Sequence, residues 1–190
     1  MLEDVQSQIN KIVDSSVIGK KIFSGIRITI LGRPNTGKSS LFNALLGHDR
    51  AITSPVAGTT RDTVESWFEL EGVPVCLVDT AGVWESKNQL DNLGVEKTIF
   101  ELDRADLCLL VDDKNPHVLF KTQFMKRYQQ HYILVKSKSD LALNPSMAED
   151  DIIYTSSKEN TGINKLLTSI STYILDNINL ADHTHGYMIT

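Results

Sequence analysis

The chain has 190 residues, of which 41% are hydrophobic and 23% charged, and its net charge is −5. This composition predicts one soluble domain with a hydrophobic core, and the mild acidity argues against direct nucleic-acid binding, which favours clustered lysine and arginine. Because neither a long apolar run nor a charged-then-apolar leader occurs, we expect no membrane segment and a cytoplasmic location.

Strands and helices are expected to alternate along most of the chain. Apolar residues at helical spacing predict a helix over residues 2–18, and "IRITILG" predicts a strand over 26–32 that ends in a glycine-rich loop. The further predicted elements are a helix over 38–46, a loop over 48–62, a hairpin of strands over 64–70 and 73–79, an aperiodic polar segment over 80–93, a helix over 94–102, a strand over 105–113, a helix over 120–130, strands over 132–136 and 151–156, and a helix over 163–178. This order predicts an α/β fold with a mostly parallel six-stranded sheet, one antiparallel edge strand, and helices on both faces.

Cysteines and the chain end offer little sign of metal chemistry. Cys76 and Cys108 each lie in an apolar strand, which predicts buried core side chains rather than a disulfide or a metal site. The polar residues 181–190 are expected to form a flexible tail. Its two histidines are expected to be solvated rather than to bind a metal.

A phosphate-binding loop follows the first strand. In "GRPNTGKSS", Gly32, Gly37, Lys38 and Ser39 fit the spacing of a loop that wraps its N–H groups around phosphate oxygens at a helix N-terminus. Lys38 is expected to reach the β- and γ-phosphates, and the Ser39 hydroxyl to bind Mg²⁺.

Two further segments are placed to sense a γ-phosphate. "DTAG", residues 79–82, follows the second hairpin strand, where Asp79 can hold Mg²⁺ through water and Gly82 can offer its N–H. "GTTRD", residues 58–62, lies in the long loop, where a hydroxyl can complete the Mg²⁺ shell. Ordering of this loop by triphosphate would make it a switch.

Two segments that follow later strands are predicted to recognise the base of the nucleotide. In "SKSD", residues 137–140, the carboxylate of Asp140 can accept hydrogen bonds from both the N1–H and the amino group of guanine, donors that adenine lacks. The Lys138 stem is expected to cover the flat base. "TSSK", residues 155–158, is placed to offer a backbone N–H to the guanine O6 atom.

These motifs, in this order, resemble a Ras-like phosphate-loop GTPase. "GRPNTGKSSLFNALLG", "AGTTRD", "DTAG" and "LGVEKTIFELDRADLCLLVDD" resemble the bacterial tRNA-modification GTPase family called MnmE or TrmE, over about residues 26–178. That family inserts its GTPase domain into a helical domain, so residues 1–24 are expected to be a stub of that domain and 25–180 the GTPase domain. The ribosome-assembly GTPase Der shares the phosphate-loop and "GTTRD" sequences and remains an alternative.

The resemblance implies the site residues. Hydrolysis is assigned to Lys38, Thr60 and Asp91, and Mg²⁺ binding to Ser39 and Thr60. A K⁺ ion is assigned to Asn35, Ser54, Val56 and Thr59. The GTP or GDP contacts are assigned to Asn35, Thr36, Gly37, Lys38, Ser39, Ser40, Ser54, Pro55, Val56, Ala57, Gly58, Thr59, Thr60, Asp79, Thr80, Ala81, Gly82, Ser137, Lys138, Asp140, Ser156, Ser157 and Lys158.

Two positions depart from the family pattern. Val83 stands where Ras-type enzymes have the glutamine that orients water, and the family's catalytic glutamate is matched by the shorter Asp91, with Glu85 as the alternative carboxylate. Ser137 replaces an asparagine that contacts the purine, so we expect guanine selectivity to persist while nucleotide affinity falls by about 1–2 kcal/mol.

The resemblance also implies a biological role. It predicts K⁺-stimulated hydrolysis of GTP to GDP and phosphate, activated when two copies dimerise through their switch regions. The full-length parent is expected to modify the tRNA wobble uridine together with a flavin-dependent partner protein. A GTP-dependent interaction switch with negligible turnover is the alternative, in which Asp91 and Ser137 have removed the chemistry.

Overall fold

The computed structural model describes residues 25–48, 64–80, 99–121, 131–141 and 149–182. The predicted helix over 2–18, residues 49–62 of the loop predicted over 48–62, and residues 81–98 lie outside the described residues. None of the described helices is long and apolar enough to cross a membrane.

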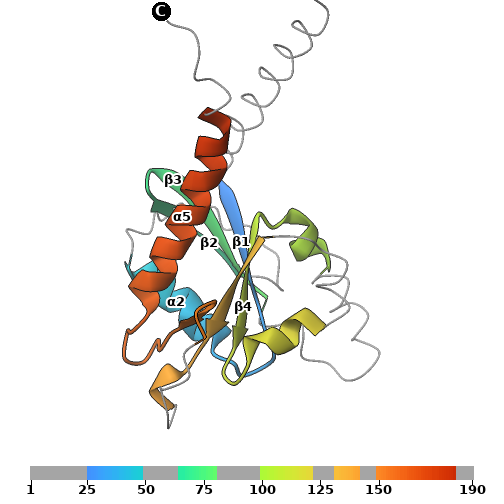
Figure 1. Cartoon of the computed structure of the whole chain (residues 1–190), viewed down its shortest axis with the longest axis vertical. Helices are drawn as coiled ribbons and strands as arrows, with labels where there is room; N and C mark the ends of the chain where they lie inside the picture. The colour runs from blue at the N-terminus through green and yellow to red at the C-terminus, as the bar shows by residue number, and fades with distance from the viewer. Residues whose placement is uncertain (1–24, 49–63, 81–98, 122–130, 142–148, 183–190) are drawn as a thin grey trace, which may run out of the picture.

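The architecture is a six-stranded sheet in the order β2-β3-β1-β4-β5-β6 (Figure 1). Only β2 runs antiparallel to its neighbour, and the other pairings are parallel. The strands are β1 (Ile26–Leu31), β2 (Val64–Leu70), β3 (Val73–Asp79), β4 (Leu107–Asp112), β5 (His131–Lys136) and β6 (Ile152–Tyr154). The predicted fold class, including the antiparallel edge strand, is confirmed.

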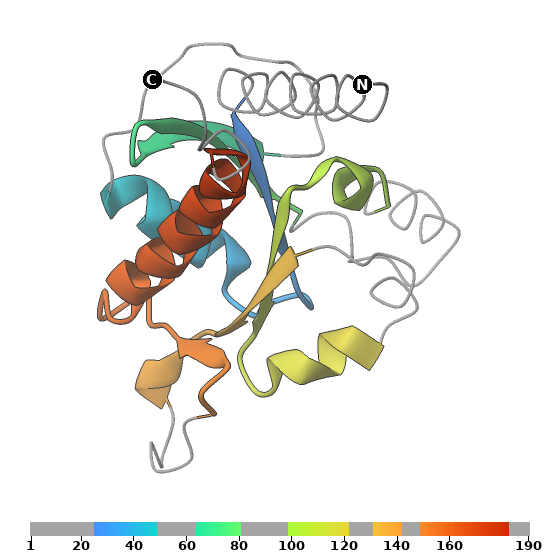
Figure 2. The ribbon, with the colours of Figure 1, turned by 45° about the horizontal axis from the view of Figure 1, so that its top comes forward.

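Helices cover both faces of the sheet, as Figure 2 shows. Helices α2 (Lys38–His48) and α5 (Ile163–Asp182) pack on one face, and the helical residues 99–104 pack on the other. Strand β4 serves both layers, because Leu107 and Leu109 join the larger core cluster while Cys108 and Leu110 join the smaller one. A strand buried on both faces reads as a continuous apolar run, which is how "LCLLVD" appears in the sequence.

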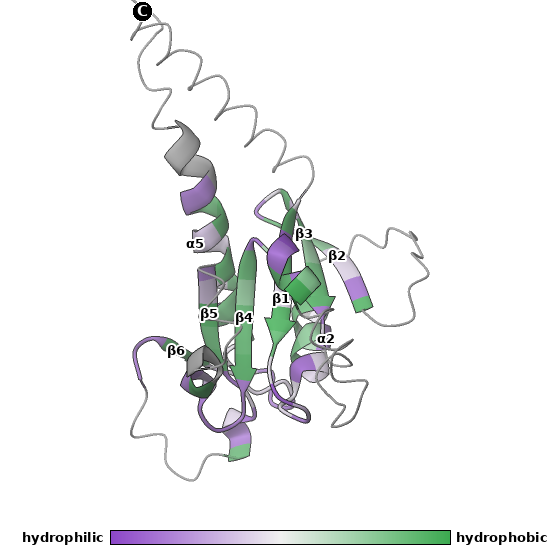
Figure 3. Ribbon diagram, turned by 90° about the vertical axis from the view of Figure 1, so that its right-hand side faces the viewer, coloured by the Kyte–Doolittle hydropathy of each residue, from purple (hydrophilic) through white to green (hydrophobic). Residues whose placement is uncertain are grey.

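The carboxyl ends of the parallel strands gather at one edge of the sheet. Figure 3 shows the strands as mainly hydrophobic and the segments beyond their ends as hydrophilic. The chain leaves β1 toward β2 and β3 on one side, whereas it leaves the adjacent β4 toward β5 on the other side, so the connections diverge between β1 and β4. Ligands of open α/β sheets bind at such a point, outside the strand ends.

Two elements differ from the sequence-based expectation. Helix α5 continues to Asp182, four residues past the predicted end, because no glycine or proline interrupts the chain before Gly186. A 3₁₀ helix, η1 (Pro116–Lys121), precedes the predicted helix over 120–130, of which residues 122–130 lie outside the described part. Its start is held by Asn115, whose side-chain oxygen accepts the N–H of His117 at 2.9 Å.

Candidate functional site

The glycine-rich loop runs from the end of β1 to Lys38, the first residue of α2. Asn35 and Gly37 both have positive φ angles, 61° and 86°, which turn the backbone tightly. Gly32 leaves no room for a side chain, since a Cβ atom there would lie 2.1 Å from the carbonyl oxygen of Val111. The loop is therefore pressed against the end of β4.

The side chain of Lys38 is bound by the backbone of the phosphate loop itself. Lys38 is buried, with 4% of its surface exposed, and its Nζ donates to the carbonyl oxygen of Arg33 at 2.6 Å. The Thr36 hydroxyl donates to the same oxygen at 2.8 Å. Ser39 and Ser40 follow at the exposed start of α2. The ammonium group thus sits inside the ring of the loop, where a phosphate chain would lie against N–H groups of the helix N-terminus.

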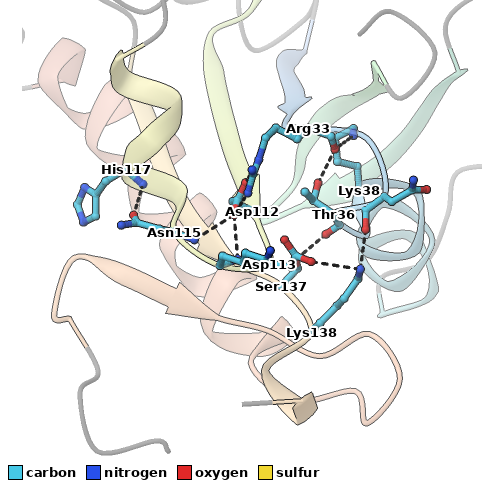
Figure 4. A network of polar contacts seen from close by, with 11 residues as sticks. Arg33, Thr36, Lys38, Asp112, Asp113, Asn115, His117, Ser137 and Lys138 are labelled. Carbon is cyan, nitrogen blue, oxygen red and sulfur yellow. Dashed lines mark hydrogen bonds and ion pairs between the residues drawn. The ribbon is translucent and has the colours of Figure 1, made fainter. Parts of the chain in front are cut away.

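An ion pair fixes the first turn of the loop (Figure 4). The Arg33 guanidinium donates to both carboxylate oxygens of Asp112, at 2.7 and 2.8 Å. Asp112 is completely buried, and it also accepts the N–H groups of Lys114 and Asn115 at 2.8 and 3.0 Å. Burial opposes ionisation, but the Arg33 bond and the two N–H donors outweigh it and lower the pKa of the Asp112 carboxyl.

The segment after β5 is joined to the same loop by two hydrogen bonds, from Ser137 and Lys138, which together form a clasp on the loop. The Ser137 hydroxyl donates to the Thr36 carbonyl oxygen at 2.5 Å, and the Lys138 Nζ donates to the Asn35 carbonyl oxygen at 2.5 Å. Lys138 also lies 3.5 Å from a carboxylate oxygen of Asp113. The loops predicted to bind phosphate and base are therefore joined directly, although they are about a hundred residues apart in sequence.

The predicted guanine-reading carboxylate lies next to the loop after β6. The Ser156 hydroxyl donates to an Asp140 carboxylate oxygen at 2.6 Å, and this bond is the main reason that the pKa of Asp140 is lowered. The lowered pKa favours the ionised carboxylate, and the exposure of Asp140 leaves it accessible. Ser156 also pairs its backbone with Thr161 in both directions at 3.0 Å, which closes the turn that contains Ser157 and Lys158.

The end of β3 supplies the remaining described residues. Asp79 is the last residue of the strand and is buried, and the Thr80 hydroxyl donates to the carbonyl oxygen of Ile30 at 2.6 Å. The other predicted site residues lie outside the described part of the chain: Ser54, Pro55, Val56, Ala57, Gly58, Thr59, Thr60, Ala81, Gly82, Val83, Glu85 and Asp91.

The described oxygen donors suit a magnesium ion. Mg²⁺ prefers hard oxygen ligands and keeps several waters. The Ser39 hydroxyl is exposed one residue after the phosphate-loop lysine, and the Asp79 carboxylate ends the strand that pairs with β1. These two residue types fit a water-rich site on a phosphate-bound ion.

The sequence reading missed the acidic pair at the end of β4. The motifs place Asp112 and Asp113 only at the end of the strand predicted over 105–113, and Arg33 only at a variable position of the phosphate-loop spacing. A signal was nevertheless present, because two carboxylates closing a buried strand at the site edge need cationic partners. Arg33 and Lys138 provide them.

A strand–loop–helix phosphate cradle, clasped to a base loop with an exposed carboxylate, defines a phosphate-loop nucleotide-binding domain of the GTPase class. A comparison with protein families agrees: the profile described as "50S ribosome-binding GTPase" matches residues 27–144. The chain belongs to this GTPase family, whose members bind GTP and GDP with Mg²⁺ and hydrolyse GTP.

Curated relatives carry a more specific name. The chain is 37% identical over 177 residues to the "tRNA modification GTPase MnmE" of Aquifex aeolicus, and 38% identical over 175 residues to that of Heliobacterium modesticaldum. These alignments cover 90% and 87% of the chain, but only 39% and 38% of the relatives. The resemblance to the MnmE family is confirmed, and the chain spans about two-fifths of the length of these relatives.

Solved structures show the same fold. The Aquifex aeolicus protein Era, bound to GDP and AlF4⁻, superposes with a TM-score of 0.59 at 26% identity, covering 77% of the chain and 56% of Era. The G domain of the T. maritima FeoB iron transporter superposes with a TM-score of 0.58 at 25% identity, covering 78% of the chain and 98% of that domain.

Proposed function

We propose that this chain is the GTPase domain of a tRNA wobble-uridine modification enzyme, and that it binds Mg²⁺ and GTP at the edge formed by β1, β3, β5 and β6. The observation that carries the site is the double clasp of Ser137 and Lys138 on the phosphate loop. This clasp fixes the distance between the phosphate cradle and the base-reading carboxylate of Asp140. The MnmE relatives support the larger role.

Binding uses each end of the site for a different part of the nucleotide. Lys38 and the N–H groups of the loop hold the β- and γ-phosphates, and Ser39 holds Mg²⁺ with water-mediated help from Asp79. Asp140 accepts the two donors of guanine and so excludes adenine. The Ser156 bond keeps one carboxylate oxygen oriented. Magnesium, when bound, neutralises charge on the phosphate oxygens.

Asn35 is proposed to bind K⁺ beside the phosphates. Its backbone is in the left-handed region, the Lys138 ammonium donates to its carbonyl oxygen, and the residue is exposed, so a cation can reach it. A monovalent cation there would supply the positive charge that other GTPases take from an arginine. Ser54, Val56 and Thr59 are the other proposed ligands.

The residues proposed for hydrolysis are Lys38, Thr60 and Asp91. Lys38 stabilises charge on the transferred phosphoryl group, Thr60 completes the Mg²⁺ shell, and Asp91 orients the attacking water. Activation is proposed to follow dimerisation through the switch regions in the GTP state. The full-length parent is proposed to act in the cytoplasm on tRNA with a flavin-dependent partner protein, without direct nucleic-acid contact by this domain.

Turnover in two salts tests the proposed function. GTP hydrolysis by the 190-residue chain is measured in KCl and in NaCl at equal ionic strength, for the wild type and Asn35→Ala. Faster turnover in KCl that Asn35→Ala abolishes is the expected result. Equal slow rates in both salts would instead support the interaction switch with negligible turnover.

A ribosome-assembly role is the second candidate, because the matching family is described as ribosome-binding. The remainder of the coding sequence separates the two. A folate-binding domain upstream and a terminal cysteine motif downstream support tRNA modification, whereas a second GTPase domain supports a Der-like protein.

A further inference from the structure

We infer that Asp112 is a positioning residue for phosphate binding, acting through Arg33 on the phosphate-loop lysine. The inference rests on the proposed assignment of Lys38 to the phosphates. Asp112 itself lies beneath the loop and is completely buried, so it holds the loop from below and does not touch the nucleotide.

The first link is a rigid ion pair between the sheet and the loop. Asp112 is the last residue of β4, and its backbone is fixed by the ladder to β5, in which it pairs with Lys136. Its two oxygens meet the Nε and Nη2 atoms of Arg33 at 2.7 and 2.8 Å. A bidentate pair of this kind fixes the plane of the guanidinium group as well as its distance.

The second link joins Arg33 to the lysine. The Arg33 carbonyl oxygen accepts the Lys38 ammonium at 2.6 Å and the Thr36 hydroxyl at 2.8 Å. Any rotation of the Arg33 peptide would move this oxygen, and the ammonium with it. Asp112 therefore sets the position of the positive charge that meets the phosphates, through one side chain and one carbonyl group.

A neighbouring bond shows that the strand end serves both halves of the site. The Ser137 N–H donates to the Asp112 backbone carbonyl at 3.0 Å. Because this bond uses the backbone, a side-chain substitution at position 112 leaves it in place. The side chain of Asp112 can therefore be tested separately from the base loop.

Asp112→Asn isolates the link to Arg33. The Oδ1 atom of Asp112 accepts the N–H groups of Lys114 and Asn115, and an asparagine oxygen can keep both bonds. Its amide nitrogen would then replace Oδ2 and face the Arg33 Nε at 2.7 Å, where two donors oppose each other. The turn before η1 is preserved, whereas the bidentate pair with Arg33 is reduced to the single bond from Nη2 to Oδ1, beside two opposed donors at Nε.

The sign of the effect separates positioning from simple electrostatics. Asp112→Asn removes a negative charge near the phosphate site, which on Coulombic grounds alone would tighten GDP binding. Positioning predicts the opposite, a loss of about tenfold or more, of the size expected for a charge-assisted hydrogen bond. Asp176→Asn, on the exposed face of α5, removes the same charge as the matched control and should leave affinity unchanged.

A double-mutant cycle with Lys38→Met is the decisive experiment. GDP and guanosine affinities of the full chain are measured by calorimetry or by competition with a fluorescent GDP analogue. We expect Asp112→Asn to weaken GDP and not guanosine, and to have little further effect on GDP in the Lys38→Met background. Arg33→Lys keeps the charge but not the fork, so it should also weaken GDP selectively.

Three results would overturn the inference: unchanged or tighter GDP binding by Asp112→Asn, equal losses for GDP and guanosine, or additive losses in the double variant. Arg33→Lys gives the same decision should Asp112→Asn fail to fold. Failure of the proposed site looks different, because Lys38→Met itself would then keep the GDP affinity of the wild type.

Discussion

The serine at position 137 makes a sharp prediction about nucleotide affinity. Its hydroxyl has one proton, and the structure commits that proton to the Thr36 carbonyl oxygen at 2.5 Å, in a site where Ser137 is only 3% exposed. The purine N7 atom is an acceptor, so the hydroxyl has nothing left to donate to it. Asparagine has two amide protons and could serve both acceptors.

Two substitutions at this position should therefore move affinity in opposite directions. Ser137→Ala removes the buried donor to Thr36 and should weaken GDP binding by about 1–3 kcal/mol, since the loops lose a clasp. Ser137→Asn should strengthen GDP binding by about 0.5–1.5 kcal/mol, the usual net value of one added hydrogen bond.

Calorimetric titration with GDP measures both effects, and thermal unfolding checks that each variant is folded. Ser169→Ala is the matched control, because it removes a serine hydroxyl bonded to a helix carbonyl on α5, at 3.1 Å from Lys165. A nanomolar GDP affinity in the wild type would refute the reasoning. A Ser137→Ala variant that matches the wild type would refute it equally.

Three further predictions concern stability and reactivity. Gly32→Ala should destabilise the fold by about 3 kcal/mol in urea unfolding, because its Cβ would meet the Val111 carbonyl oxygen; an unchanged midpoint would contradict the observed loop packing. Asp112 has a lowered pKa in the folded state, so its contribution should be present above its ordinary pKa and be lost as pH falls through the folded value, and Asp112→Asn should flatten this acid decline in urea midpoints. Burial raises the pKa of Cys76 to about 11 and of Cys108 to about 12, so neither should be alkylated by iodoacetamide at neutral pH until urea unfolds the chain.

The fold could be predicted from the sequence because its signals are local. Apolar runs such as "LCLLVD" and the hairpin around Glu71 and Gly72 each specify an element within a few residues. The order of those elements then leaves few topologies. The extension of α5 was missed, since its final residues carry neither a strong stop signal nor a strong apolar period.

Site residues also fall into those that local sequence indicates and those that only the folded structure brings together. Lys38, Asp79 and Asp140 could be proposed from the sequence because each belongs to a short motif that follows or ends a strand. The Arg33–Asp112 pair could not, since its members are 79 residues apart and only the closed sheet brings them together. That position 137 ties the base loop to the phosphate loop is implied by the family resemblance, but its hydrogen bond to Thr36 follows only from the way the two loops meet across the edge of the sheet.

Base selectivity tests the central claim, a guanine-nucleotide site read by Asp140, most directly. Competition binding compares GDP, ADP and xanthosine diphosphate for the wild type and for Asp140→Asn. The wild type should bind GDP far better than ADP. Asp140→Asn keeps an oxygen for the Ser156 hydroxyl but loses the acceptor for the guanine donors, so it should weaken GDP about 100-fold and prefer xanthosine diphosphate, whose C2 oxygen accepts the new amide. A variant that still prefers GDP would contradict the assignment of this site.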